Sequence, residues 1–73
     1  MTAAPWQTVV DRLAIESHNA RHRARSLDEA YLTAPTRADR IRVVVEQNRY
    51  HLAADVLMRM AVDLVDEHTR AAP

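Results

Sequence analysis

The fold is decided by residues 36–70, which read TRADRIRVVVEQNRYHLAADVLMRMAVDLVDEHTR. Thr36 is followed three residues later by Asp39, a variant of the capping box that starts helices. Because neither Gly nor Pro interrupts the stretch, it predicts one helix about 50 Å long, at ~1.5 Å per residue. Two alternatives are a short strand at residues 42–46, which hold three consecutive valines, and a new helix capped at Asn48.

The residues before this stretch predict a second helix. Pro5 suits the first turn of a helix, where its missing N–H costs nothing. Apolar or small residues then follow in alternating steps of three and four, the spacing of a coiled-coil seam. They are Val10, Leu13, Ser17, Ala20, Ala24, Leu27 and Tyr31.

A second capping box, residues 26–29, lies inside this first helix. It would break the helix near Arg25 and start a short third helix at Leu27. The seam keeps its phase through Leu27 and Tyr31, so we favour a continuous or kinked helix. This helix ends by Ala34, because Pro35 holds the residue before it in an extended conformation.

The short turn at residues 33–36 makes the two long helices antiparallel. Residues whose numbers add up to about 69 then face each other, so residues 6–15 meet residues 54–63. The sequence therefore predicts an all-α fold, an antiparallel helical hairpin that becomes three helices if the first helix is kinked. We expect one domain over residues 1–73, with residues 1–4 and 68–73 frayed.

The chain is too small and too apolar in its second half to remain alone. Residues 52–65 are apolar around most of the helix, and one facing helix covers only one side. With 73 residues and no cysteine, the chain has a marginal core and no disulfide to support it. We predict a homodimer in which two hairpins form a four-helix bundle through this base. The predicted interface residues are Leu57, Met58, Ala61, Leu13 and Trp6.

Charge is separated along the hairpin although the formal net charge is zero. Residues 19–51 carry seven Arg against four acids, net +3, and the remaining residues carry three Arg against six acids, net −3. Arg side chains close to a helix N-terminus are unfavourable in the field of the helix dipole. Their presence there indicates that they bind an anionic partner. The alternative is an ordinary solvated surface. The candidate tip residues are Arg37, Arg40, Arg42, Arg21 and Arg25.

Four side chains have metal-ligand spacing. His18 and His22 are four residues apart, as are His51 and Asp55, so each pair shares one helix face. His18 and His22 point away from the seam, however, which favours exposed histidines and no bound metal. We also predict no cofactor and no catalytic centre, since the chain has no Cys nucleophile, no Lys and no glycine loop.

These features favour a small non-enzymatic protein–protein interaction or regulatory module that acts as a homodimer and binds another protein. One alternative is a nucleic-acid-binding regulator that uses the Arg tip. A second is a helical enzyme or metal-binding protein whose site is shared between chains. No apolar run is long enough to span a membrane and no signal peptide is visible, so we expect a cytoplasmic protein without a membrane partner.

Overall fold

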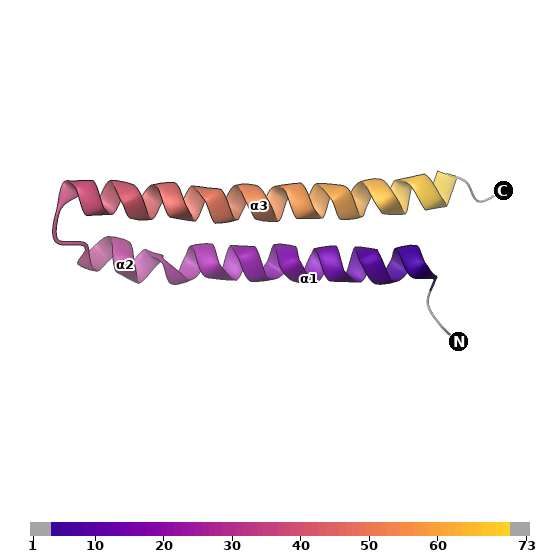
Figure 1. The fold of residues 1–73 in the computed structure, drawn as a ribbon, viewed down its shortest axis with the longest axis horizontal. Helices are drawn as coiled ribbons and strands as arrows, with labels where there is room; N and C mark the ends of the chain where they lie inside the picture. The colour runs from indigo at the N-terminus through magenta and orange to yellow at the C-terminus, as the bar shows by residue number, and fades with distance from the viewer. Residues whose placement is uncertain (1–3, 71–73) are drawn as a thin grey trace.

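The computed structural model describes residues 4–70, which form a helical hairpin (Figure 1). Helix α1 spans Pro5–Ser26, α2 spans Asp28–Thr33 and α3 spans Arg37–Arg70. Helices α1 and α2 follow one line and run antiparallel to α3 (Figure 1). The predicted all-α hairpin is confirmed. Residues 42–46 and Asn48 lie inside α3, so neither the strand nor the break forms.

Both long helices begin with a capping interaction. The backbone N–H of Asp39 donates to the Thr36 hydroxyl oxygen at 3.1 Å, and that hydroxyl donates to the Asp39 carboxylate at 2.8 Å. The predicted start of α3 is thereby confirmed. At α1, the backbone N–H of Ala4 donates to the side-chain oxygen of Gln7 at 3.1 Å, just ahead of Pro5. These contacts satisfy backbone groups that a helix end leaves unpaired.

The first helix is interrupted at Leu27, so residues 4–70 form three helices. The N–H of Leu27 donates to the Ala24 carbonyl at 3.2 Å, a three-residue spacing that tightens the turn. Ser26 does not cap the next helix as its capping-box pattern predicts. Its hydroxyl donates backward to the Arg23 carbonyl at 2.7 Å. Leu27 keeps right-handed helical angles (φ −84°, ψ −6°), which is why α2 continues almost in line with α1.

The open end of the hairpin differs from the expectation of a loose tail from His68. Helix α3 continues to Arg70, and the imidazole of His68 stacks on the indole of Trp6 with ring centroids 4.5 Å apart. Aromatic contact therefore holds the two helix ends together. The seam hydrogen bonds join Ser17 to Ala54 and Gln47 to Ala24, so the numbers of facing residues add up to 71, close to the predicted sum of about 69. Residues 1–3 and 71–73, the rest of the predicted frayed ends, lie outside the described residues.

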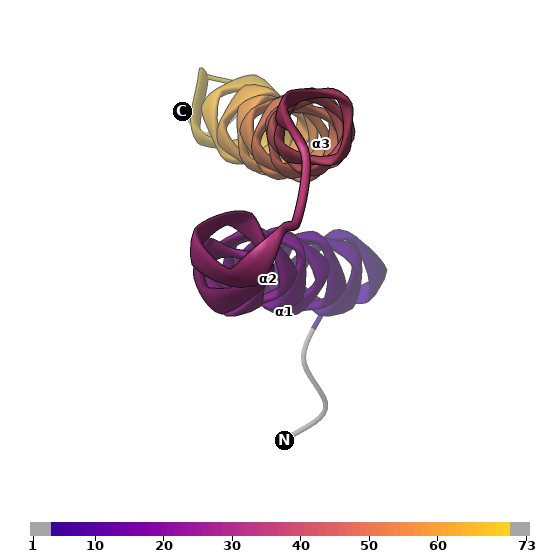
Figure 2. The ribbon, with the colours of Figure 1, turned by 90° about the vertical axis from the view of Figure 1, so that its left-hand side faces the viewer.

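The seam between α1 and α3 is built from small side chains. Figure 2 shows the hairpin from its tip, with α3 lying along α1 and α2. The predicted 3–4 spacing in α1 agrees with this burial, although Tyr31 is exposed. A matching row on α3 has the same spacing and is buried or half-buried throughout: Val43, Gln47, Tyr50, Ala54, Leu57, Ala61 and Leu64. The most deeply buried residues of the two helices are Ser17, Ala20, Ala24, Ala54 and Ala61.

Hydrogen bonds across the seam require this close approach. The Ser17 hydroxyl donates to the backbone carbonyl of Ala54 at 2.7 Å, and the Gln47 amide donates to the carbonyl of Ala24 at 2.9 Å. A side chain reaches a backbone carbonyl on another helix only when no bulky neighbour separates them. Gln47 also donates to the Asp28 carboxylate at 2.7 Å, which fixes α2 against α3.

We predict that Ala54→Leu destabilises the protein by about 1–3 kcal/mol, because the larger side chain forces the helices apart at a fully buried position. The matched control is Ala53→Leu at the neighbouring exposed position, which should change stability by about 0.5 kcal/mol or less. Urea unfolding of both variants measures the difference. Equal stability of the two variants would show that the seam does not depend on small residues.

Candidate interaction surface

Most large apolar side chains remain exposed, because the seam between α1 and α3 is narrow. They are Val9, Ile15, Tyr31, Leu32, Ile41, Val44, Val45, Leu52, Val56, Met58, Met60, Val62 and Val65. Their exposed fractions lie between 38% and 80%, the highest being that of Leu32. Exposed apolar area on this scale marks an interaction surface in a protein that does not aggregate.

Five of these side chains lie in a second row of α3 that has coiled-coil spacing. The row consists of Ile41, Val44, Asn48, His51, Asp55, Met58, Val62 and Val65. Its members again alternate in steps of three and four, and all of them are exposed. At about 100° per residue, this row lies roughly 100° around α3 from the seam. We call it the outer row; it has two apolar ends and a polar centre.

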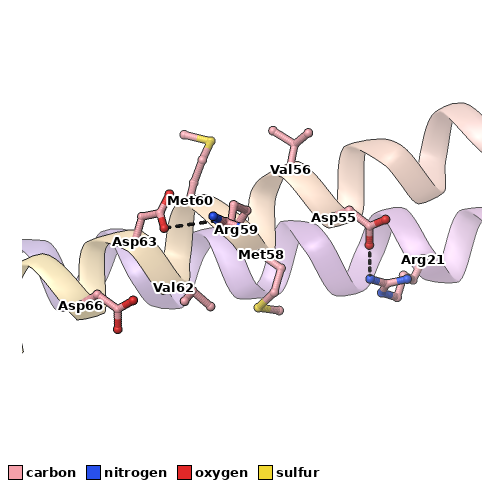
Figure 3. A pocket seen from close by; sticks show the side chains of 9 residues that line it. All are labelled: Arg21, Asp55, Val56, Met58, Arg59, Met60, Val62, Asp63 and Asp66. Carbon is pink, nitrogen blue, oxygen red and sulfur yellow. Dashed lines mark hydrogen bonds and ion pairs between the residues drawn. The ribbon is translucent and has the colours of Figure 1, made fainter.

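The base end of the outer row borders an open hollow beside Met58 and Val62 (Figure 3). In this view α1 lies behind α3, and Met58 and Val62 point to one side of α3 whereas Val56 and Met60 point to the other. Asp66 lies at the end of the hollow, on the side of Val62 (Figure 3). The outer row therefore ends in an apolar surface next to an acidic side chain.

The tip end of the outer row has the opposite charge. A second open hollow is lined by Tyr31, Arg37, Arg40, Ile41, Val44 and Val45. Here aliphatic side chains of α3 are bordered by two Arg side chains and one aromatic ring from α2. The base hollow also holds Arg21 and Arg59, but these pair with Asp55 and Asp63, which leaves Asp66 as the charge outside an ion pair there. Each end of α3 thus combines apolar area with an excess of one sign of charge.

The structure separates the five predicted tip arginines. Arg37, Arg42 and Arg25 are exposed, and Arg40 is half-buried. Arg42 lies 3.7 Å from the Asp39 carboxylate, so part of its charge is offset at the helix N-terminus.

Arg21 does not belong to the tip. Its guanidinium lies 2.6 Å from the Asp55 carboxylate in the middle of the hairpin, where the pair joins α1 to α3 (Figure 3).

The predicted interface residues already have roles inside one chain. Ala61 is buried in the seam, and Trp6, Leu13 and Leu57 are half-buried there. Met58 alone among the five is exposed, at 41%. The sequence pattern assigned Leu57 and Ala61 to a second chain because residues 52–65 are apolar all round and do not show which side faces α1.

The candidate metal ligands do not converge within one chain. His18, His22 and His51 are exposed, and Asp55 pairs with Arg21. Among residues 4–70, no group of three or more His, Cys, Asp or Glu side chains could hold a metal ion. The absence of a bound metal stays a prediction.

None of the helices in residues 4–70 has the length and apolar content to cross a bilayer.

Comparisons with protein-family models, curated proteins and solved structures found no match for this chain. Evidence for function therefore comes from the surface itself. The sequence interpretation placed the apolar surface at the base and missed its continuation to the tip, through Tyr31, Leu32 and Ile41. The 3–4 spacing of the outer row is the signal that could have revealed it.

We predict that the ion pair between Arg21 and Asp55 contributes about 0.2–1 kcal/mol to stability. Although the contact is short, the two side chains are 41% and 63% exposed, so water screens the attraction. A double-mutant cycle with Arg21→Ala and Asp55→Ala, measured by urea unfolding, gives the coupling energy directly. A coupling above about 2 kcal/mol would mean that the pair is shielded from solvent.

Proposed function

We propose that this protein is a small non-enzymatic interaction or regulatory module that acts as a helical homodimer. The observation that supports it is the outer row of α3, an exposed row of coiled-coil spacing that runs the length of the helix. Such a row is the pattern by which helices associate. In a single hairpin every member of the row is exposed, and Asp55 contacts α1 through its ion pair with Arg21.

The energetics of the hairpin support the same proposal. Fully buried side chains are Ser and Ala, and burying a methyl group contributes only about 0.8 kcal/mol, against about 1.5–3 kcal/mol for a large aliphatic side chain. Ordering each residue costs at least as much conformational entropy. Many of the large aliphatic side chains that could balance this cost are exposed. Association of two copies through the outer row would bury those that lie in it, such as Val44, Met58 and Val62, and stabilise the folded chain.

The alternative, a nucleic-acid-binding regulator, is supported by the exposed tip cations Arg25 and Arg37 together with Tyr31, which is 40% exposed. A phosphate-binding surface needs several cations along one groove. The hollow beside Tyr31 is instead lined by three aliphatic side chains and only two Arg. Apolar docking therefore accounts for more of the surface than phosphate binding does.

We expect the protein to sediment as a dimer at micromolar concentration, with a thermal midpoint that rises with protein concentration because folding and association are linked. Val62→Asp places a charge in the outer row and should raise the dimer dissociation constant by roughly 100-fold or more. Met60→Asp is the matched control, since Met60 is similarly exposed but points to the other side of α3. A compact monomer that stays folded at these concentrations contradicts the proposal.

The nucleic-acid alternative makes a different prediction about salt. Binding of short DNA or RNA through Arg25 and Arg37 would weaken steeply between 50 and 200 mM salt, because bound cations release counterions from the phosphates. Apolar association of two hairpins should change little over the same range. Titration of a labelled duplex and a labelled single strand, monitored by fluorescence anisotropy, distinguishes the two functions.

A further inference from the structure

We propose that two copies of the chain pair antiparallel through the outer rows of their α3 helices, so that the tip of each hairpin lies against the base of the other. This inference rests on the proposed homodimer and adds its geometry. The two-fold axis passes close to residue 53, the midpoint of the outer row. The anionic partner of the Arg-rich tip is then the acidic base of the second copy.

The outer row is apolar at both ends and polar in the middle. Its tip end is Ile41 and Val44 and its base end is Met58, Val62 and Val65, with Asn48, His51 and Asp55 between them. The antiparallel arrangement sets Asn48 opposite Met58 at the edge of the polar centre. In the antiparallel arrangement, residue 41 packs against residue 65 of the second copy and residue 44 against residue 62. Residue 51 then meets residue 55, so polar side chains face each other at the centre. Polar residues inside a coiled-coil seam fix its register.

Charge decides between the antiparallel and the parallel arrangement, since both match apolar ends with apolar ends. Arg37 borders the tip hollow and Asp66 borders the base hollow. Both are exposed, and neither forms an ion pair within residues 4–70. A parallel dimer would place the two Arg37 side chains beside each other, and likewise the two Asp66 side chains. Like charges would then repel at both ends. In the antiparallel dimer Asp66 of each chain lies opposite residue 40 of the other, so Arg37 is within one helical turn of the Asp66 of its partner copy and the opposite charges attract.

Helix α1 supports the same axis independently. Ser17 contacts Ala54, so a two-fold axis near residue 53 of α3 passes close to His18 of α1. Asp11 and Arg25 lie on one face of α1, seven residues to either side of His18. Both are exposed and outside any ion pair in the described part of the chain. The antiparallel axis that joins Arg37 to Asp66 also brings Asp11 of each copy to the level of Arg25 of the other.

The angle between the two rows of α3 gives the overall shape. The seam with α1 and the outer row are roughly 100° apart around α3, close to a right angle. With a two-fold axis perpendicular to the helices, α1 of both copies therefore lies on the same side of the paired α3 helices. The result is a four-helix bundle with one helix at each corner, which differs from a flat row of four.

Single cysteines test this geometry cleanly, because the chain has none of its own. Val44→Cys mixed with Val62→Cys should form a cross-linked dimer with a short bis-maleimide. Each variant alone should not, because the antiparallel arrangement separates two copies of residue 44 by roughly 27 Å, at about 1.5 Å per residue. The matched control mixes Val44→Cys with Met60→Cys, which points to the other side of α3, and should give no product.

Each other pattern of cross-links overturns the inference. A parallel dimer would cross-link each variant with itself, and a dimer through the base alone would cross-link Val62→Cys with itself. Circular dichroism checks that each variant is helical. Sedimentation of the parent separates the two proposals: a monomeric parent refutes the homodimer itself, whereas a dimer with self-cross-links refutes only the antiparallel geometry.

Charge reversal tests the contact between tip and base. Arg37→Glu alone and Asp66→Arg alone should each weaken dimerisation by roughly tenfold, since each homodimer would hold two repulsive pairs. An equimolar mixture of the two variants should form a heterodimer. One of its two contacts is then the native pair of Arg37 and Asp66, and the other is the same pair with the charges exchanged. Failure of the mixture to associate more tightly than either variant alone would refute the contact.

Discussion

The structure depends on the close approach of α1 and α3, which small side chains allow. Ser17, Ala20, Ala24, Ala54 and Ala61 keep the helices near enough for the Ser17 hydroxyl to reach the Ala54 carbonyl. A larger residue at any of these positions would separate the backbones and break that hydrogen bond. The same feature limits stability, since methyl groups bury little apolar area. The close packing therefore defines the geometry of the hairpin but contributes little to its free energy of unfolding.

The exposed surface follows from that narrow seam. Because one heptad row of α3 is occupied by the contact with α1, the remaining large apolar residues have no place inside one chain. Five of them, Ile41, Val44, Met58, Val62 and Val65, lie in a second row of the same spacing, a little more than a quarter turn away. A helix with two such rows is the arrangement found at the corner of a helical bundle, where each helix contacts two neighbours.

Charge separation gives this surface a direction. The three-residue excess of positive charge at the tip and the equal negative excess at the base leave the hairpin neutral but polarised. Some of this charge is used within the chain, as in Arg21 with Asp55 and Arg42 with Asp39. Arg37 and Asp66 lie beside the two apolar ends of the outer row instead. Their positions favour a neighbouring copy that places its base against the tip of this one, because opposite charges then meet.

The sequence by itself determined the antiparallel hairpin, its two long helical arms and the start of α3, because the Thr36 cap, Pro35 and the seam spacing are local signals. It left the break at Leu27 open, since the capping-box pattern at Ser26 does not form a cap. Only the tertiary structure decided which side of α3 faces α1. Residues 52–65 are apolar all round, so periodicity could not distinguish Ala61 in the seam from Met58 on the surface. The Trp6–His68 stack and the Arg21–Asp55 pair likewise depend on register, which short-range pattern does not fix.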